Sequence, residues 1–180
     1  KDDEIGTFRY LMKQFPTGIL SIVSDTWDLW KVLTVYLPIL KDEILKRDGK
    51  IVIRPDSGNP VDIICGTARN EKDTILGKYV DYKPEEKGVI QLLWDLFGGT
   101  TNEQGYKVLD PHIGAIYGDA ITLDRAEQIC ERLEAKGFAS TNVVLGIGSF
   151  TYQYNTRDTF GFAMKATYVE LQDESKELEP

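Results

Sequence analysis

The sequence predicts an α/β fold built on a parallel sheet, as part of a TIM-like β/α barrel. Two observations lead to this prediction. Short apolar runs rich in Val and Ile alternate along the chain with segments whose apolar residues recur at helical spacing. Polar or Gly-rich turns follow four of these runs, and in a parallel α/β barrel such turns share the face on which ligands bind.

The composition is that of one globular domain spanning residues 1–180. With 42% hydrophobic residues the chain can form a full core, and no run is long enough to span a membrane. The net charge of −8 argues against nucleic-acid binding. Cys65 and Cys130 show no metal-binding spacing and no secreted framework, so a cytoplasmic location is expected. The absence of an initiator Met suggests a piece of a longer protein.

In the first half of the chain, each helix is followed by a strand. The predicted elements are a helix over residues 4–14, a strand over 19–24, a helix over 30–45 and a strand over 51–53. Pro38 is expected to kink or divide the second helix, because proline cannot donate a helical hydrogen bond. Asp48-Gly49 is interpreted as the turn that leads into the second strand.

The second half continues the alternation after an exposed polar segment. The predicted elements are a helix over 60–65, the polar segment over 66–87, a helix over 88–97, a loop or short hairpin over 100–110, a strand over 113–117, a helix that starts at 122 and strands over 143–145 and 162–171. Asn59 and Thr122 are the expected N-caps. Trp27, Trp30 and Trp94 occupy helical positions and are expected in the core.

The turn after the second strand carries the clearest functional signal. Side chains alternate along an extended segment, so Arg54 and Asp56 are expected to project to the same side, with Pro55 fixing the backbone between them. Arg pairs with phosphate, and a carboxylate accepts from vicinal hydroxyls. These residues therefore suit a phosphorylated sugar, although a turn that only reverses the chain would carry similar residues.

The other three turns offer further candidates. Asp25 ends the first strand, and Ser21 is expected to face the barrel mouth. Gly118-Asp119 fits either a plain helix entry or hydroxyl recognition. Gly146-Ile147-Gly148-Ser149 fits a phosphate cradle or an ordinary loop, and Arg157 is either a phosphate-binding cation or a surface residue.

Other common catalytic patterns are missing from the sequence. His112 is the only histidine, and its place at the entry to a strand, on the opposite edge from these turns, indicates a structural role. The sequence has no Ser-His-Asp set, no zinc-binding spacing and no P-loop, so no metal site is predicted.

Four runs carry a resemblance to the nicotinamide phosphoribosyltransferases, a branch of the type II phosphoribosyltransferases. They are Ser21-Ile22-Val23-Ser24-Asp25, Ile53-Arg54-Pro55-Asp56-Ser57-Gly58-Asn59-Pro60, Tyr117-Gly118-Asp119 and Thr156-Arg157-Asp158. The resemblance covers about residues 5–171 and is strongest to the bacterial or phage-encoded branch. It implies a homodimeric enzyme with an α/β-barrel domain that converts nicotinamide and phosphoribosyl pyrophosphate to nicotinamide mononucleotide and pyrophosphate. It also implies Mg²⁺ with the pyrophosphate, and ATP as an optional co-substrate that phosphorylates a histidine.

The resemblance also implies roles for single residues. The arginine that meets the base and the diphosphate corresponds to Arg54, and the carboxylate on the ribose hydroxyls corresponds to Asp56, with Pro55 between them in the substrate site. Gly118 and Asp119 resemble a second ribose-binding pair. Asp25 resembles the acid that orients the catalytic histidine.

The remaining implied roles concern the phosphate and the passage behind the base. Ser21 resembles a residue of that passage. Ser149 follows Gly148 and occupies a position near the 5′-phosphate where the family has glycine. This departure from the family pattern weakens the resemblance at the Gly-rich phosphate cradle. Arg157 and Lys165 resemble phosphate contacts that serve the neighbouring subunit.

The family's phosphorylated histidine and base-stacking aromatic would lie before Lys1, and His112 does not match that histidine. The chain is therefore expected to be part of a catalytic domain and inactive alone. Two alternatives stay open: a nicotinate phosphoribosyltransferase, and a non-catalytic module that binds sugar phosphates.

Overall fold

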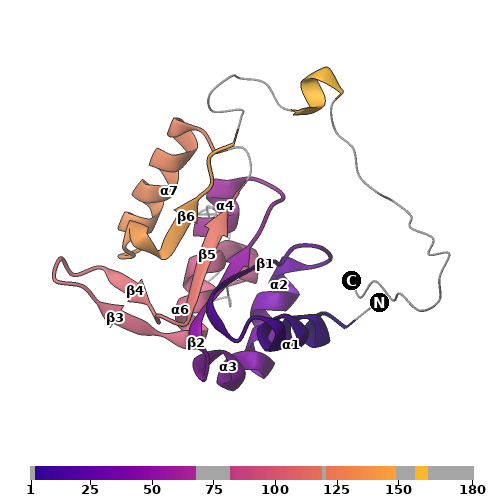
Figure 1. Ribbon diagram of the computed structural model, residues 1–180. Coiled ribbons are helices and arrows are strands. Elements are labelled where there is room, and N and C mark those ends of the chain that lie inside the picture. The colour runs from indigo at the N-terminus through magenta and orange to yellow at the C-terminus, as the bar shows by residue number, and fades with distance from the viewer. Residues whose placement is uncertain (1–2, 68–81, 119–120, 149–156, 162–180) are drawn as a thin grey trace.

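The computed structural model describes residues 3–67, 82–118, 121–148 and 157–161, in which helices and strands alternate (Figure 1). The helices are α1 (Glu4–Gln14), α2 (Leu29–Lys31), a π-helical turn (Val32–Tyr36), α3 (Leu37–Leu45), α4 (Pro60–Cys65), α5 (Pro84–Lys87), α6 (Val89–Phe97) and α7 (Leu123–Ala135). The strands are β1 (Thr17–Val23), β2 (Asp48–Arg54), β3 (Gly99–Thr101), β4 (Lys107–Leu109), β5 (Ile113–Tyr117) and β6 (Val143–Leu145). Short 3₁₀ turns span Ser140–Asn142 and Arg157–Phe160.

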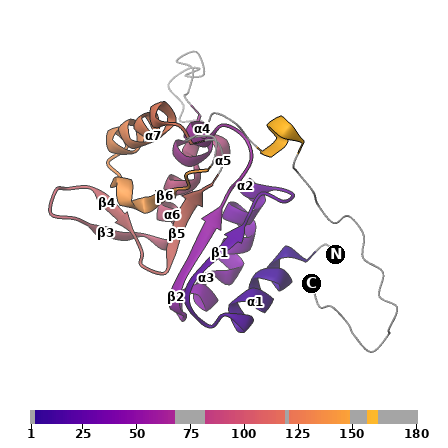
Figure 2. The same ribbon diagram turned by 45° about the horizontal axis from the view of Figure 1, so that its top comes forward.

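Four strands form one parallel sheet in the order β1-β2-β5-β6. β1 and β2 pair along their full lengths, and β5 pairs with both β2 and β6. Helix α1 lies on the β1 side of the sheet and α7 on the β6 side (Figures 1 and 2). The arrangement confirms the predicted parallel α/β fold and agrees with part of a TIM-like barrel, although the described strands form an open sheet.

The two faces of this sheet differ in what covers them. Ile22, Ile53 and Tyr117 point to the face that carries the helices, and all three side chains are buried. On the opposite face, Ile19 is 77% exposed and Val144 is 59% exposed. One face therefore forms the core of the molecule, and the other is open in this chain.

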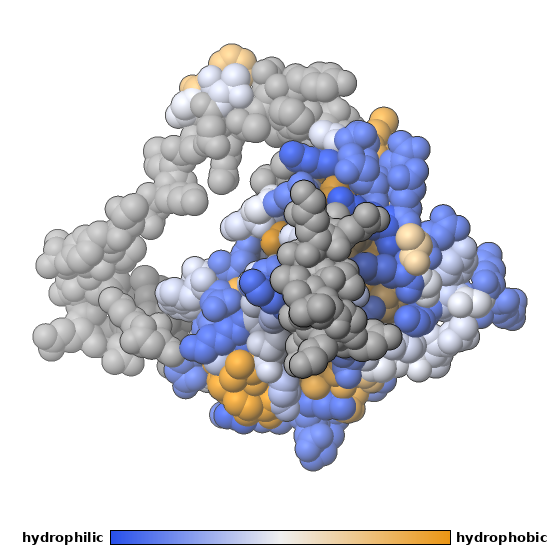
Figure 3. Space-filling model, turned by 180° about the vertical axis from the view of Figure 1, so that it is seen from behind, coloured by the Kyte–Doolittle hydropathy of each residue, from blue (hydrophilic) through white to orange (hydrophobic). Residues whose placement is uncertain are grey.

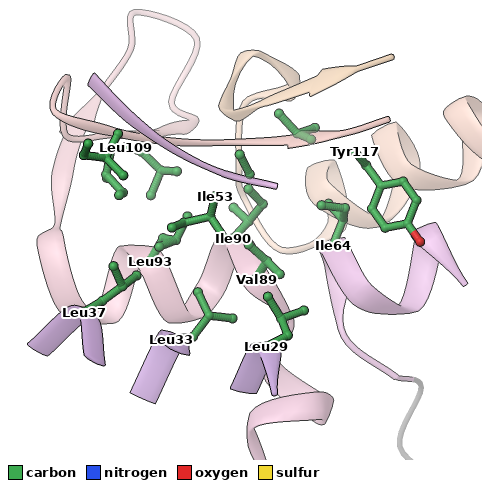
Figure 4. Packing of buried hydrophobic residues seen from close by; sticks show 14 of the residues in the cluster. Leu29, Leu33, Leu37, Ile53, Ile64, Val89, Ile90, Leu93, Leu109 and Tyr117 are labelled. Atoms are coloured by element: carbon green, nitrogen blue, oxygen red, sulfur yellow. The ribbon is translucent and has the colours of Figure 1, made fainter. Parts of the chain in front are cut away.

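The core lies between the helices and the covered face of the sheet. Leu29, Leu33 and Leu37 point from the second helical segment toward Val89 and Leu93 of α6 (Figure 4). The helical spacing of these leucines places them on one side of their helix. Hydrophilic residues cover most of the surface seen from behind, with hydrophobic residues gathered near its lower edge (Figure 3).

Several predicted boundaries are confirmed. Asn59 caps α4 by accepting from the Val61 N–H at 3.1 Å, and Thr122 caps α7 by accepting from the Arg125 N–H at 3.3 Å. Residues 99–109 form the predicted hairpin, with β3 and β4 antiparallel. Pro38 stands in the first turn of α3 directly after the π-helical turn, so the hydrogen-bond pattern changes next to this proline while the backbone stays helical from Leu29 to Leu45.

Two local predictions are wrong. Asp48-Gly49 is not a turn: both residues belong to β2, where Gly49 pairs with Gly18 of β1. A Cβ at Gly49 would lie 2.0 Å from the Gly18 carbonyl oxygen, so this glycine serves a close backbone approach. Trp27 is not a core residue, since it follows β1 in a loop and is 66% exposed.

The predicted polar segment over 66–87 is partly correct. Pro84–Lys87 forms the short helix α5, which the sequence pattern did not predict. Thr67 donates its N–H to the Glu85 carbonyl oxygen at 2.9 Å, so the two ends of the segment lie side by side. The rest of the segment and the predicted strand over 162–171 lie outside the described residues. Within the described ranges, no helix is long and apolar enough to cross a membrane.

Candidate functional site

The predicted functional turns begin at the carboxyl ends of the four parallel strands, which meet at one edge of the sheet. The Ser24 N–H donates to the Arg54 carbonyl oxygen at 3.1 Å, which extends the pairing of β1 and β2 to this edge. The buried Ser24 hydroxyl donates to the Ile22 carbonyl oxygen at 2.7 Å. The backbone that precedes the loops after β1 and β2 is therefore fixed by hydrogen bonds.

Residues 54–59 form the loop that follows β2, and they carry the predicted cation and carboxylate. Arg54 Nη2 lies 3.9 Å from Asp56 Oδ1, so the two side chains share one side of the loop, as predicted. Both side chains are partly exposed, at 42% and 44%. Gly58 adopts a φ of 87°, which favours glycine, and Asn59 then starts α4.

Asp25 reaches from the end of β1 to this loop. Its Oδ2 accepts hydrogen bonds from the backbone N–H groups of Asp56 and Ser57, each at 2.7 Å. A carboxylate that accepts two backbone N–H bonds fixes the local conformation strongly, because such charge-assisted bonds are short and strong. In this structure Asp25 therefore positions the residues around Asp56.

Tyr117 holds the same loop from the other side. Its ring is buried at the end of β5, and its hydroxyl lies 2.9 Å from the Ser57 carbonyl oxygen and 3.0 Å from that of Gly58. Tyr117 begins one of the four runs that carry the family resemblance, but the sequence predicts no role for it. Its local signal is an aromatic with a polar tip at the end of a strand, directly before the Gly118 turn.

Two glycines allow the ends of β5 and β6 to approach the Arg54 side chain and each other. A Cβ at Gly118 would lie 3.3 Å from Arg54 Nη2, and one at Gly146 would lie 2.9 Å from the Gly118 Cα. The Gly146 N–H donates to the Tyr117 carbonyl oxygen at 2.7 Å. Gly118 therefore leaves room for the guanidinium, whose buried Nε has no hydrogen-bond partner among the described residues.

The structure brings together some of the predicted site residues. Arg54, Pro55, Asp56, Asp25 and Gly118 meet around one loop, and Pro55 is buried there. The other candidates are placed elsewhere or lie outside the described residues.

Ser21 lies exposed on the open face of the sheet, beside Val52, and stands two residues before the end of β1. Gly148 is exposed, with no atom within 4 Å of a Cβ placed on it. Arg157 begins a 3₁₀ turn. Asp119, Ser149 and Lys165 lie outside the described residues.

Other reactive groups lie away from this loop. His112 sits at the opposite edge of the sheet, where its Nδ1 lies 2.7 Å from Asp110 Oδ1. Burial raises the pKa of the Cys65 thiol to about 11, so this thiol stays protonated at neutral pH. No group of three His, Cys, Asp or Glu side chains among the described residues could hold a metal ion. The arrangement at the loop can donate to a phosphate through Arg54 and accept from hydroxyls through Asp56.

Known proteins resemble the chain over nearly its whole length. Residues 1–179 match the Nicotinate phosphoribosyltransferase (NAPRTase) family. A nicotinamide phosphoribosyltransferase from Acinetobacter baylyi is 54% identical over 185 residues, which cover 99% of this chain and 35% of that protein. Proteins of the same name from Mycoplasma pneumoniae and Mycoplasma genitalium are 45% and 39% identical, over 94% and 92% of this chain and 36% and 35% of theirs. The chain thus spans about a third of the length of these relatives.

Proposed function

Because this chain belongs to the nicotinate phosphoribosyltransferase family, we propose that the whole protein joins nicotinamide to the ribose of phosphoribosyl pyrophosphate. The products are nicotinamide mononucleotide and pyrophosphate. The names of three relatives support nicotinamide as the base. The chain covers about a third of those relatives. Its proposed part in the reaction is to bind the ribose and its phosphates, which suit the Arg54 and Asp56 side chains.

The observation that carries this proposal is the pairing of Arg54 and Asp56 on one loop at the carboxyl edge of a parallel sheet. The guanidinium can donate two parallel hydrogen bonds to the diphosphate, and the carboxylate can accept from the ribose hydroxyls. Ligands of open α/β sheets bind at this edge. The loop backbone is already fixed, so little ordering of the loop backbone is needed when the substrate binds.

Displacement at the anomeric carbon passes through a state with oxocarbenium character. This chain contributes to it by holding the ribose through Asp56 and by facing the negative charge of the leaving pyrophosphate with Arg54. Mg²⁺ bound to the pyrophosphate would neutralise part of that charge, and the partly exposed carboxylate of Asp56 is a hard oxygen ligand that fits this ion. ATP is proposed as an optional co-substrate of the whole protein.

The other predicted contacts extend this site and stay predictions. Asp119, directly after Gly118, is proposed as a second ribose contact, and Gly148 with Ser149 as the neighbourhood of the 5′-phosphate. The proposed role of Asp25 in orienting a catalytic histidine is separate from its observed contacts with the loop. Ser21 is proposed to line the passage behind the base.

A homodimer in the cytoplasm is proposed as the working form of the protein. In a homodimer, Arg157 and Lys165 would contact the phosphate of the neighbouring subunit. The two cysteines are free thiols, and free thiols are usual in a reducing compartment.

The experiment that tests the site is calorimetric titration of the chain with ribose 5-phosphate and with nicotinamide mononucleotide. Replacing Asp56 by Ala is expected to weaken binding of both ligands at least tenfold, because hydrogen bonds to a charged group contribute about 1.5–3 kcal/mol. Asp42→Ala is the matched control, since it removes the same charge from the exposed surface of α3. Equal affinities for all three proteins would contradict the proposed site.

The choice of base is tested on the whole protein that contains this chain. Incubation with phosphoribosyl pyrophosphate and either nicotinamide or nicotinate should yield mononucleotide from nicotinamide. Nicotinate is the second candidate because the family as a whole is named for it. Faster product formation from nicotinate would favour that alternative, and turnover of neither base would favour a non-catalytic sugar-phosphate-binding module.

A further inference from the structure

The structure points to a further residue that positions the candidate site. We propose that Tyr117 is a positioning residue for the loop that carries Arg54 and Asp56. It acts together with Asp25, which holds the loop from the opposite side. This inference rests on the proposed function, because the loop matters for catalysis only if it binds the substrate. We call the contacts of Asp25 and Tyr117 with residues 56–58 the loop clamp.

The loop clamp joins three neighbouring strand ends. Asp25, after β1, accepts from the N–H groups of Asp56 and Ser57, each at 2.7 Å. Tyr117, at the end of β5, shares its one hydroxyl proton between the carbonyl oxygens of Ser57 and Gly58, which lie at 2.9 and 3.0 Å. The loop between them continues β2, the strand that lies between β1 and β5 in the sheet. Each side of the loop is thus fixed by a residue from a different neighbouring strand.

The two halves of the clamp act on successive peptide units: Asp25 binds the N–H groups of the units before Asp56 and Ser57, and Tyr117 binds the carbonyl groups of the units after Ser57 and Gly58. A short loop has both N–H donors and carbonyl acceptors. A partner that binds only the N–H groups leaves the carbonyl groups free to turn toward water, and the reverse also holds. Asp25 offers only acceptors and Tyr117 contributes a donor, so together they hold Ser57 from its N–H to its carbonyl group. The backbone on which the Asp56 carboxylate is mounted is fixed as a result.

The buried position of Tyr117 explains why the contact is made by a tyrosine hydroxyl. The ring is 1% exposed and belongs to the core cluster, where it lies beside Ile64 of α4 (Figure 4). A phenylalanine would keep this packing and remove only the hydroxyl. Tyr117→Phe therefore separates the effect on the loop from the effect on the core.

Amide hydrogen exchange tests the clamp without any ligand. In Tyr117→Phe, the amides of Asp56 and Ser57 are expected to exchange at least tenfold faster than in the unchanged chain, because the closed loop loses one of its two anchors. The matched control is Tyr106→Phe, which removes a hydroxyl that donates to Glu134 Oε1 at 2.9 Å, away from the loop. Asp25→Ala, at a half-exposed position, provides a second variant with the same expected direction if Tyr117→Phe does not fold.

Unchanged exchange at Asp56 and Ser57 in a folded Tyr117→Phe chain would overturn the proposal. So would equal acceleration in the Tyr106→Phe control. If Tyr117→Phe does not fold, unchanged exchange at these two amides in Asp25→Ala would overturn it.

A double-mutant cycle then tests whether Tyr117 acts through Asp56. Binding of ribose 5-phosphate is measured by calorimetry for the unchanged chain, Tyr117→Phe, Asp56→Ala and the double variant. Tyr117→Phe is expected to weaken binding about fivefold to tenfold alone and less than twofold when Asp56 is already replaced. Equal weakening in both backgrounds would overturn the role of Tyr117 as a positioning residue for Asp56. If the unchanged chain binds no ribose 5-phosphate, the proposed site fails, and the exchange measurement still decides the clamp.

Discussion

At the scale of single residues, the position of the Arg54 guanidinium depends on the space that neighbouring residues leave empty. Gly118 faces it from the next strand in the sheet, and the Asp56 carboxylate flanks it at 3.9 Å. A side chain at position 118 would occupy the space in which the guanidinium lies. The orientation of this cation therefore depends on the lack of a side chain at Gly118 as much as on the ion pair with Asp56.

Gly118→Ala is expected to move the Arg54 side chain with little loss of stability. The new Cβ would lie 3.3 Å from Nη2, closer than an ordinary contact, and 3.5 Å from Nε, so the flexible end of the arginine must shift by a few tenths of an ångström. We expect a changed Nε–H resonance of Arg54 in the NMR spectrum and a change of about 1 kcal/mol or less in the free energy of unfolding.

Gly114→Ala is the matched control for this change. Gly114 lies on β5, the strand that ends directly before Gly118, and its new Cβ would meet the Lys50 side chain at 3.3 Å, so the crowding is similar but does not involve Arg54. An unchanged Arg54 resonance in Gly118→Ala, or the same change in Gly114→Ala, would contradict the prediction.

At the scale of helices and strands, periodicity and caps predict most of the structure, and pairing between distant segments explains the errors. The helix over residues 4–14 and the cap at Asn59 depend on neighbours in sequence, so local patterns suffice. Gly49 reads as a turn residue, but it belongs to β2 because Gly18 of β1 approaches it closely. That approach is a tertiary contact, so the residues next to Gly49 in the sequence do not reveal it.

Gly66 and Gly88 show a second close approach of this kind. Both have positive φ, at 87° and 79°, and a Cβ at Gly88 would lie 2.2 Å from the Gly66 backbone nitrogen. The contact joins the end of α4 to the start of α6. Because the obstructing atom is backbone, no side-chain rotation can relieve the clash.

Gly88→Ala is therefore expected to lower the free energy of unfolding by about 3 kcal/mol or more. Urea denaturation followed by circular dichroism measures this change. Gly105→Ala is the control, because Gly105 has a similar φ of 88° but no atom within 4 Å of a new Cβ, and it should cost only about 1 kcal/mol. Equal losses in the two variants would show that backbone conformation alone, without the clash, determines the effect.

At the scale of the whole molecule, topology predicts where the site lies but not how its loop is held. Parallel strands bring their carboxyl ends to one edge, so the meeting of Asp25, Arg54 and Gly118 follows from the order of elements. The hydrogen bonds that Asp25 accepts from Asp56 and Ser57, and that Tyr117 donates to the loop carbonyls, do not follow, because they depend on where each loop turns after its strand. The sequence predicts a site for ribose and phosphate at this loop, and the structure shows the contacts that hold the loop backbone.

The two faces of the sheet give the last prediction. Ile19 and Ile22 belong to the same strand and point to opposite faces, and they are 77% and 6% exposed. Ile22→Ala is expected to lower the free energy of unfolding by about 2–5 kcal/mol, because it leaves a cavity in the core. Ile19→Ala should cost about 1 kcal/mol or less, mainly through reduced strand propensity.

Both variants are compared by urea denaturation at low protein concentration. A large loss for Ile19→Ala would mean that the open face of the sheet is covered in solution, since an exposed side chain has no packing to lose. Repeating the measurement at tenfold higher protein concentration then shows which segment or molecule covers the open face. If the loss of unfolding free energy in Ile19→Ala grows with protein concentration, a second copy of the chain covers the face, because association stabilises the folded state by mass action. If that loss does not depend on protein concentration, a segment of the same chain covers the face.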